Sequence, residues 1–303
     1  MSDYHVSVLL KESIEYLNIR PEGIYVDATF GAGGHSGAIL NKLNAKGHLY
    51  AFDQDADAVE NSIVDNRFTL IEANFRYLRR FLRLEEVDLV DGILADLGVA
   101  SHQLDQPERG FSYRYEAQLD MRMNRESDFT AAILLRTYSE EKLVEVLSNY
   151  GEVRNSITLA KALVQAGRMS EIRSTFDLNR VLDQHVSGPR LKYFSQVYQA
   201  LRMEVNDEMG ALKELLAEGF KILKPGGRFV MITFHSIEDR VVKNFFKTGN
   251  FEGEVDKDDF GNITRPFTLV NKKVIMADKK EQRENVRSRS AKLRVAEKVV
   301  MGM

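Results

Sequence analysis

The sequence predicts an α/β protein with a Rossmann-like parallel sheet and an inserted helical subdomain. Strand-like apolar stretches alternate with amphipathic helical stretches in the first hundred residues, and this alternation resumes in the last hundred. A glycine-rich turn joins the first strand to the first crossover helix, as in nucleotide-binding βαβ units. From about residue 105 the alternation gives way to successive helical patterns. We therefore expect a core of residues 1–104 and 196–303, with an inserted helical domain, 105–195, that recognises the substrate.

The composition excludes several classes of site. The 303 residues are 44% hydrophobic and 29% charged, which is ordinary for a globular protein. No cysteine is present, which rules out disulfides, thiolate metal sites and thiol nucleophiles and agrees with a cytoplasmic location. We expect no membrane segment, since no stretch approaches the roughly 18 apolar residues that a span requires. The six histidines suggest no metal site. Because the net charge is only −3, a surface for a polyanion must be local.

The first strand, Ile24–Val26, leads through Asp27 into the glycine-rich turn. Glycine permits positive φ and close backbone approach, and the helix that follows points its N-terminal amides at the turn. The third glycine is one position away from the dinucleotide fingerprint, whereas Asp27 could face the cationic end of S-adenosylmethionine (SAM). A turn that merely closes a strand onto a helix is the alternative, which the glycines alone do not exclude. The glycines concerned are Gly31, Gly33 and Gly34.

The second and third strands end in further candidate ligand contacts. His48–Phe52 stops at Asp53, whose carboxylate could accept hydrogen bonds from ribose hydroxyls or could instead cap the next helix. Phe68–Ile71 is followed by Phe75, either a wall for an adenine ring or a core aromatic.

The fourth and fifth strands point to the reaction side of the site. Val87–Leu94 leads to Asp96, and ligands of open α/β sheets collect outside the carboxyl ends of strands. Arg228–Phe234 is the fifth strand, and His235 follows it as either a general base or a histidine hydrogen-bonded in a turn.

Helices and closing strands complete the pattern. An N-terminal helix is expected within 8–17, and three inserted helices begin near Ser139, Ile157 and Thr175. Asn206 is expected to cap the helix before the fifth strand. The last two strands, expected to form an antiparallel pair, are Phe267–Ile275 and Leu293–Val299.

The C-terminal region concentrates positive charge. From Arg265 to Met303 there are eleven basic and four acidic residues, a local net charge of +7 in a chain of net charge −3. Such a region suits RNA phosphates, although a solvated mixed-charge tail is the commoner meaning of charge alone. Guanidinium and hydroxyl groups together, as in Arg287-Ser-Arg289-Ser, favour phosphate contact.

Several runs resemble the MraW (RsmH) family of bacterial small-subunit ribosomal RNA cytosine methyltransferases. They include D-A-T-F-G-A-G-G-H-S (27–36), D-L-G-V-A-S-H-Q-L-D (96–105), F-H-S-I-E-D-R-V-V-K (234–243) and R-S-R-S-A-K-L-R (287–294). The resemblance implies a class I SAM-dependent methyltransferase core with the inserted domain. It also implies methylation of the exocyclic amine, N4, of a cytosine in the decoding region of 16S ribosomal RNA within the small subunit. Carried over by position, the cofactor contacts are Gly33, Gly34, His35, Asp53, Phe75, Asp96 and Gln103.

The sequence departs from the family at Ala100, where the family has serine, and at Ala117-Gln118, where it has Gly-Pro. The second change leaves the path of that loop open.

The residues agree with amine chemistry. Methylation at carbon five of cytosine normally needs a thiolate, whereas attack by an amine needs only orientation and a hydrogen-bond acceptor for its protons. We expect Asp96 or its neighbouring backbone carbonyls to supply that acceptor, with His235 as an alternative base. The remaining candidates for base stacking and RNA contact are Phe111, Tyr113, His235, Arg109, Arg287, Arg289 and Arg294. A non-catalytic ribosome-assembly factor and a nucleotide-dependent oxidoreductase stay as alternatives, and a homodimer stays open.

Overall fold

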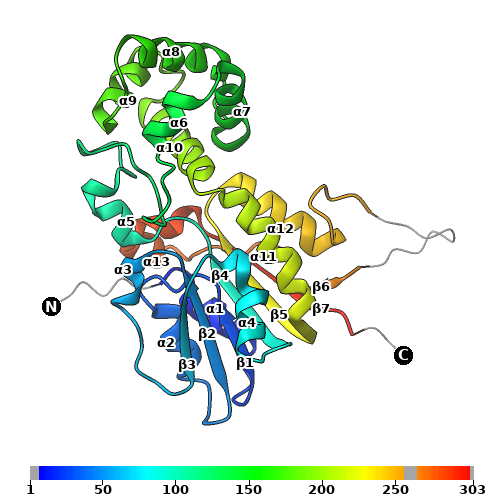
Figure 1. Ribbon diagram of the computed structural model, residues 1–303. Helices are drawn as coiled ribbons and strands as arrows, with labels where there is room; N and C mark the ends of the chain where they lie inside the picture. Colours follow the sequence, from blue (N-terminus) through cyan, green and yellow to red (C-terminus); the bar gives the residue numbers. More distant parts are fainter. Residues whose placement is uncertain (1–6, 256–264, 301–303) are drawn as a thin grey trace. The chain divides into compact units, whose positions relative to one another are not determined.

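The computed structural model describes residues 7–255 and 265–300, which divide into two compact units (Figure 1). The first unit comprises Met1–Gly98 and Gly210–Met303, and the second comprises Val99–Met209. The helical insertion expected at 105–195 falls inside the second unit, which begins six residues earlier and ends fourteen residues later.

The first unit is built on a seven-stranded sheet in the order β3-β2-β1-β4-β5-β7-β6. β1 to β5 run parallel, while β7 is antiparallel to both β5 and β6. The order reverses between β1 and β4, which is the position where doubly wound sheets bind ligands. This arrangement confirms the Rossmann-like core. The strands are β1 (Ile24–Asp27), β2 (His48–Asp53), β3 (Phe68–Glu72), β4 (Val90–Asp96), β5 (Leu223–Thr233), β6 (Phe267–Leu269) and β7 (Lys292–Lys298).

Helices cover both faces of this sheet. One face packs on α1 (Leu10–Leu17) and α2 (Gly34–Leu40), and the residues of this layer include Leu94, Val230 and Leu293. Alternate strand residues face the other side, where Phe229 contacts Phe246 of α12 and Phe52 contacts Phe81 of α4. The helices of this second layer are α4 (Leu78–Leu84), α11 (Glu208–Ile222) and α12 (Ser236–Thr248).

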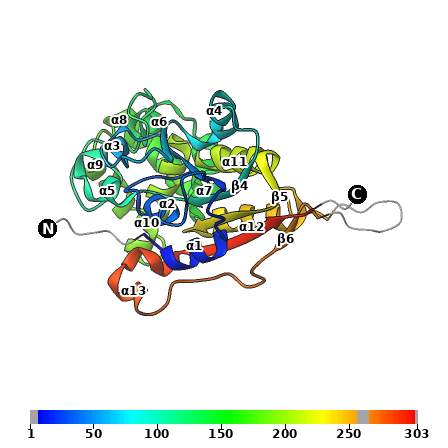
Figure 2. The same ribbon diagram turned by 90° about the horizontal axis from the view of Figure 1, so that it is seen from below.

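The N-terminal segment is joined to a C-terminal segment far away in sequence. The backbone N–H of Leu9 donates to Glu281 Oε1 at 2.8 Å, and Figure 2 shows α1 beside the segment that carries α13 (Glu281–Glu284). Leu9, Ala277 and Ala291 are buried in one apolar cluster. The remaining short helices of this unit are α3 (Ala56–Val59) and the 3-10 helices η1 (Phe75–Tyr77) and η3 (Val286–Ser290).

Two expectations for the elements were wrong. Asn206 ends α10 as its C-cap, while its side chain binds the Met123 N–H and the Met121 carbonyl. The expected strand over 267–275 ends at Leu269, and Ile275 makes only an isolated bridge to Leu293.

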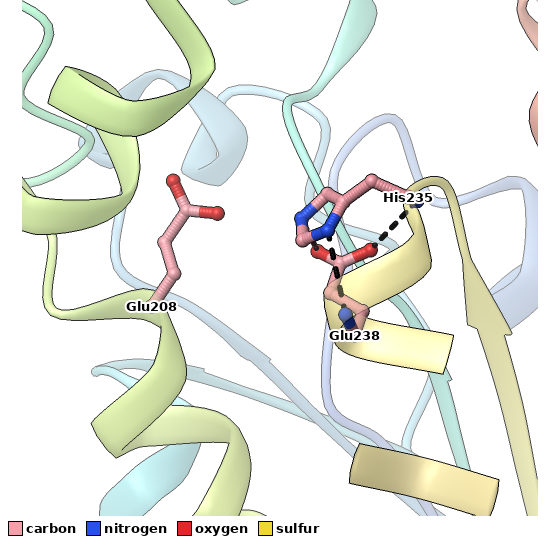
Figure 3. Close-up of side chains that lie close together, drawn as sticks. All are labelled: Glu208, His235 and Glu238. Atoms are coloured by element: carbon pink, nitrogen blue, oxygen red, sulfur yellow. Dashed lines mark hydrogen bonds and ion pairs between the residues drawn. The ribbon is translucent and has the colours of Figure 1, made fainter. Parts of the chain in front are cut away.

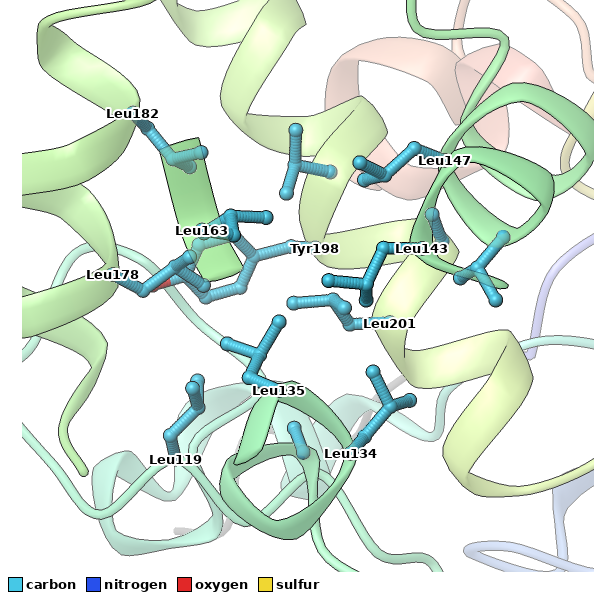
Figure 4. Close-up of a cluster of buried hydrophobic side chains, with 14 of the residues drawn as sticks. Leu119, Leu134, Leu135, Leu143, Leu147, Leu163, Leu178, Leu182, Tyr198 and Leu201 are labelled. Carbon is cyan, nitrogen blue, oxygen red and sulfur yellow. The ribbon is translucent and has the colours of Figure 1, made fainter. Parts of the chain in front are cut away.

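The second unit is helical, and its core is shown in Figure 4. Tyr198 and Leu201 of α10 lie among leucines from the surrounding helices, including Leu143 and Leu178. Ser139 caps α7, and Ser174 with Asp177 forms a capping box on α9, so side chains define where these helices begin. The elements are α5 (Ser101–Asp105), η2 (Pro107–Arg109), α6 (Ala131–Thr137), α7 (Glu140–Gly151), α8 (Ser156–Met169), α9 (Thr175–Asp183) and α10 (Arg190–Val205).

Candidate functional site

The glycine-rich turn has the backbone geometry that only glycine adopts readily. Gly31 and Gly33 have φ values of 53° and 77°, in the left-handed region. The Gly31 N–H donates to Asp53 Oδ2 at 2.8 Å, which ties the turn to the end of β2. A Cβ on Gly34 would lie 2.1 Å from Ser7 Oγ, so the N-terminal segment packs directly on the start of α2.

The position of Asp55 decides between the two possible roles of Asp53, helix cap or ribose contact. Asp55, not Asp53, is the N-cap of α3, and its side chain accepts from the Asp57 N–H. Asp53 accepts from the Gly31 and Asp55 N–H groups and remains half-buried at the sheet edge. Its carboxylate therefore stands beside the turn, as the ribose role requires.

Asp27 lies beneath the turn. Its side chain is fully buried and accepts from the Thr29 N–H at 3.1 Å and the Ser36 hydroxyl at 2.7 Å. Burial raises the pKa of Asp27 to about 7, while the bonds from Ser36 and Thr29 act in the opposite direction. Asp27 therefore fixes the shape of the turn from inside, and its charge depends on pH near neutrality.

Asp96 ends β4 as an acid without a cationic partner among its described neighbours. Its side chain is 22% exposed, yet Oδ1 is buried and hydrogen-bonds to no described residue. Thr29 Oγ1 accepts from its backbone N–H at 2.7 Å. Burial, and then the nearby carboxyls of Asp27, Glu238 and Glu281, raise the pKa of Asp96 well above its usual value. An unsatisfied buried oxygen of this kind is a natural acceptor for a ligand donor.

His35 contributes a side chain as well as a backbone amide to this region. Its ring is buried, with Nε2 3.2 Å from the Val8 carbonyl and Nδ1 3.8 Å from Asp96 Oδ2. Because a carbonyl only accepts, Nε2 carries the proton and Nδ1 presents a lone pair. Burial lowers the pKa of His35 to about 4, so the ring is uncharged near neutral pH.

His235 is held in a turn by one carboxylate (Figure 3). Its Nδ1 accepts from the Glu238 N–H at 3.3 Å, its Nε2 lies 2.9 Å from Glu238 Oε1, and Glu238 Oε2 accepts from the Phe234 N–H. This capping box starts α12 and uses Nδ1 of the ring, whereas Nε2 lies close to Glu238 Oε1 but is buried without a hydrogen bond to any described residue. The geometry therefore favours the hydrogen-bonded turn over a freely acting base.

Figure 3 also draws Glu208, which belongs to the second unit. Its carboxylate is bound by both Nε and Nη2 of Arg202, at 2.7 and 2.8 Å. Because this guanidinium already satisfies the carboxylate within its own unit, we assign no metal ion to Glu208.

Two further cofactor candidates lie in separate units. Phe75 begins η1 at the end of β3 and is half-buried, beside the hydrogen bond from Asn74 to Gln54. Gln103 belongs to the second unit, where it is buried and accepts from the Ala100 N–H through Oε1.

The predicted substrate residues of the second unit take part in its packing. Arg109 is buried and donates to the Arg122 and Met123 carbonyls, and its guanidinium lies 5.8 Å from the Phe111 ring centre. Phe111 is itself buried. Tyr113 makes edge contacts with Phe194 and Tyr198. These three side chains are therefore engaged in packing within the second unit, and we do not assign them to substrate binding.

The three C-terminal arginines differ in their surroundings. Arg289 is exposed and donates to the Gln282 carbonyl, whereas Arg287 is half-buried. Arg294 donates to both oxygens of Asp239, so its guanidinium already stabilises the join of β7 and α12. Arg289 is the best placed of the three for a phosphate.

Sequence reasoning missed Thr29, Val8 and Glu238. Thr29 lies inside the D-A-T-F-G motif, so its position there was a usable signal. Glu238 likewise lies inside the F-H-S-I-E-D run, three residues after His235, whereas the contact of Val8 with His35 spans 27 positions and no local pattern indicates it.

Comparison with known proteins gives one consistent result. Residues 2–299 match the family model described as the MraW methylase family. The chain is 55% identical to a ribosomal RNA small subunit methyltransferase H of Phocaeicola vulgatus over 97% of each chain. It is also 55% identical to the protein of that name in Cytophaga hutchinsonii, over 97% of this chain and 99% of the other. Within 7–255 and 265–300, no helix combines the length and apolar character that crossing a bilayer requires.

Proposed function

The chain belongs to the MraW methylase family, and we propose that it transfers a methyl group from SAM to the N4 amine of a cytosine. The proposed target lies in the decoding region of 16S ribosomal RNA within the small subunit, in the cytoplasm. One observation carries the chemistry: the buried, unpartnered Oδ1 of Asp96 lies at the end of β4, where the sheet order reverses.

The residues around this edge fit SAM. The glycine turn offers backbone amides, Asp53 offers a carboxylate for the ribose, and Phe75 offers a ring at the end of β3. Asp96 offers an acid to the ammonium and sulfonium of SAM, and its raised pKa comes first from burial and then from nearby carboxyls, with no cation among the causes. When bound, SAM supplies a methyl group on a positively charged sulfur.

Asp96 is the proposed catalytic acceptor. The cytosine amine is a weak nucleophile because its lone pair is delocalised into the ring, so it must be oriented and must lose a proton as the N–C bond forms. Asp96 Oδ1 is buried and accepts no hydrogen bond from the described residues, so its capacity as an acceptor is unused within the protein. Attack at carbon five is disfavoured because the chain has no cysteine to activate the ring.

RNA binding is assigned to the C-terminal segment. Exposed cations outnumber exposed acids there, since only Asp278 and Glu284 are exposed acids among the described residues 265–300, and phosphate contacts of this kind give affinity that falls with salt. The exposed basic residues are Arg265, Lys272, Lys273, Lys279, Lys280, Arg283 and Arg289.

Labelled SAM and purified small ribosomal subunits test the function. After incubation the RNA is digested to nucleosides, and we expect label in N4-methylcytidine from a single position. Label at carbon five, label in protein, or no label with protein that binds SAM would refute the proposal.

Two variants provide the controls. Asp96→Asn should still bind subunits but lose methylation, which separates an enzyme from an assembly factor that only binds. His48→Gln is the matched control, because His48 begins β2, at the opposite end of that strand from Asp53, and contacts Thr69. It should methylate like the unchanged protein.

A further inference from the structure

The buried pair formed by His35 and Asp96 has a definite polarity. The Val8 carbonyl takes the Nε2 proton of His35, so the Nδ1 lone pair is the group that faces Asp96 Oδ2 at 3.8 Å. At this distance the two atoms form no hydrogen bond, but a lone pair facing a carboxylate is unfavourable, and protonation of the carboxyl removes that repulsion. The geometry of His35 therefore favours the acid form of Asp96.

The charged groups around Asp96 act in the same direction. Burial is the largest cause that raises the pKa of Asp96, and the carboxyls of Asp27 on β1, Glu238 on α12 and Glu281 on α13 raise it further. Of these, Glu281 is itself raised in pKa by burial, and Glu238 is held in the capping box with His235. Carboxyls thus face Asp96 from three elements, and an uncharged imidazole faces it from α2.

The N-terminal segment holds this arrangement together. Val8 binds His35 through its carbonyl, the next residue donates its N–H to Glu281, and Ser7 packs on Gly34. Three consecutive residues therefore connect the glycine turn, the histidine and the C-terminal acid. This segment sets which ring nitrogen of His35 carries the proton.

We propose that Asp96, facing the lone pair of His35, carries a proton in the free protein and gives it up when a cationic ligand binds beside it. His35 is then a positioning residue that stabilises the acid form, and Asp96 is the group whose charge follows the charge of the ligand. The inference rests on the proposed function for the identity of that ligand, SAM.

The charges balance through the proposed reaction. Binding of the cation leaves Asp96 as a carboxylate, so the pair of charges is neutral. In methyl transfer the C–S bond breaks, the N–C bond forms, and the sulfonium becomes an uncharged thioether. The amine gains positive charge and passes one proton to Asp96 Oδ1, which restores the neutral carboxyl. The site therefore carries the same net charge before and after transfer, and the uncharged thioether product loses its electrostatic attraction.

Carbon-13 NMR of the free protein tests the first half. In protein labelled at the aspartate carboxyl carbons, the Asp96 resonance, assigned by its loss in Asp96→Asn, should still report a protonated acid where ordinary aspartates are ionised. His35→Leu has no lone pair to face Asp96, so Asp96 should titrate at lower pH in this variant. His48→Gln should leave the titration unchanged. An Asp96 that titrates as an ordinary aspartate, or that is indifferent to His35→Leu, would overturn the proposal.

Calorimetry tests the second half with two probes, SAM and S-adenosylhomocysteine. Near neutral pH, in two buffers of different ionisation enthalpy, binding of SAM should release more protons than binding of the uncharged thioether, by about one. Asp96→Asn should remove that difference. Equal proton release by both probes would contradict the inference, even if His35→Leu failed to fold.

The two proposals fail in different ways. If SAM releases the extra proton but ribosomal RNA is not methylated, the proposed function is refuted and the inference about Asp96 is supported. If ribosomal RNA is methylated but SAM and S-adenosylhomocysteine release equal numbers of protons, the inference is refuted and the proposed function is supported.

Discussion

Asp96 ends β4 and Asp239 lies in the first turn of α12, the helix after the neighbouring strand β5, yet their surroundings are opposite. Arg294 donates to both oxygens of Asp239, at 2.7 and 3.1 Å, and Lys292 approaches it at 3.5 Å. Burial acts to raise the pKa of Asp239, but the bonds and charges of Arg294 and Lys292 outweigh it, and the pKa is lowered. Asp96 is surrounded by carboxyls, and its pKa is raised.

The contrast separates an acid that stabilises the fold from an acid reserved for a ligand. Asp239 joins α12 to β7, and its charge is satisfied within the protein. Asp96 costs stability when ionised, because no described cation compensates it, and such strained groups concentrate at functional sites. The following predictions test whether these two acids are as different as their contacts indicate.

The largest effect is expected at Asp96. Asp96→Asn keeps the size of the side chain but cannot take up a proton, so methyl transfer should fall by roughly 10²–10⁴-fold, the usual contribution of general acid–base catalysis. Single-turnover methylation of small subunits measures this loss. Thermal unfolding serves as the fold control, because the variant should be at least as stable as the unchanged protein at pH 8. A loss of less than about threefold would make Asp96 a bystander.

Asp27 should make stability depend on pH. Its pKa is raised from 3.8 to about 7, so the folded state binds more protons than the unfolded state between these values. The free energy of unfolding should therefore fall as pH rises through this window, by at most about 4 kcal/mol, since one pKa unit is worth about 1.4 kcal/mol.

Urea unfolding of Asp27→Asn against the unchanged protein, at several pH values, measures the contribution of Asp27 together with its coupling to Asp96. His35, whose pKa is lowered to about 4, acts in the opposite direction below pH 6.5 and is common to both proteins. A stability difference that stays constant from pH 4 to pH 8 would contradict the raised pKa of Asp27.

Substitution of Asp239, the acid paired with Arg294, should lower stability but leave SAM binding and methyl transfer nearly unchanged. Asp239→Ala leaves Arg294 and Lys292 without their carboxylate, and we expect a loss of about 1–3 kcal/mol in unfolding free energy. SAM affinity should be nearly unchanged. The double variant Asp239→Ala, Arg294→Ala should recover part of the loss, because it removes the unpaired cation. A variant that lost SAM binding while staying folded would end the distinction between the two acids.

The sequence predicted the acids better than it predicted their partners. Asp53 and Asp96 follow from strand patterns, because parallel strands bring their carboxyl ends to one edge. The Arg294–Asp239 pair joins residues 55 positions apart, and the local R-S-R-S-A-K-L-R run suggested a phosphate contact instead. The role of the His35 ring depends on Val8, which only the folded chain brings to it.

Domain limits were hard to predict for a similar reason. The expected end of the insertion at residue 195 falls inside α10 (Arg190–Val205), a continuous helix without proline or glycine. The second unit ends only at Met209, beyond that helix. Helical periodicity predicts that a helix has an apolar face but not which unit that face packs against. A domain boundary between two helical stretches therefore cannot be predicted from the local pattern.

The smallest effect on activity and stability is expected from substitution of Arg289. Arg289 and Arg294 differ as Asp96 and Asp239 do, because one is exposed and the other is paired with an opposite charge. Arg294 is committed to Asp239, whereas Arg289 is exposed and donates only to the Gln282 carbonyl among the interactions seen. Arg289→Ala should leave unfolding within about 0.5 kcal/mol, as for most surface changes. Small-subunit affinity should weaken severalfold, and the dependence of log affinity on log salt should become shallower by about one contact. Arg265→Ala, another exposed arginine of the same segment, shows whether the effect belongs to Arg289 or to the charge of the segment as a whole. Binding titrations at three salt concentrations decide this, and an unchanged salt slope in both variants would remove the C-terminal segment from the RNA-binding surface.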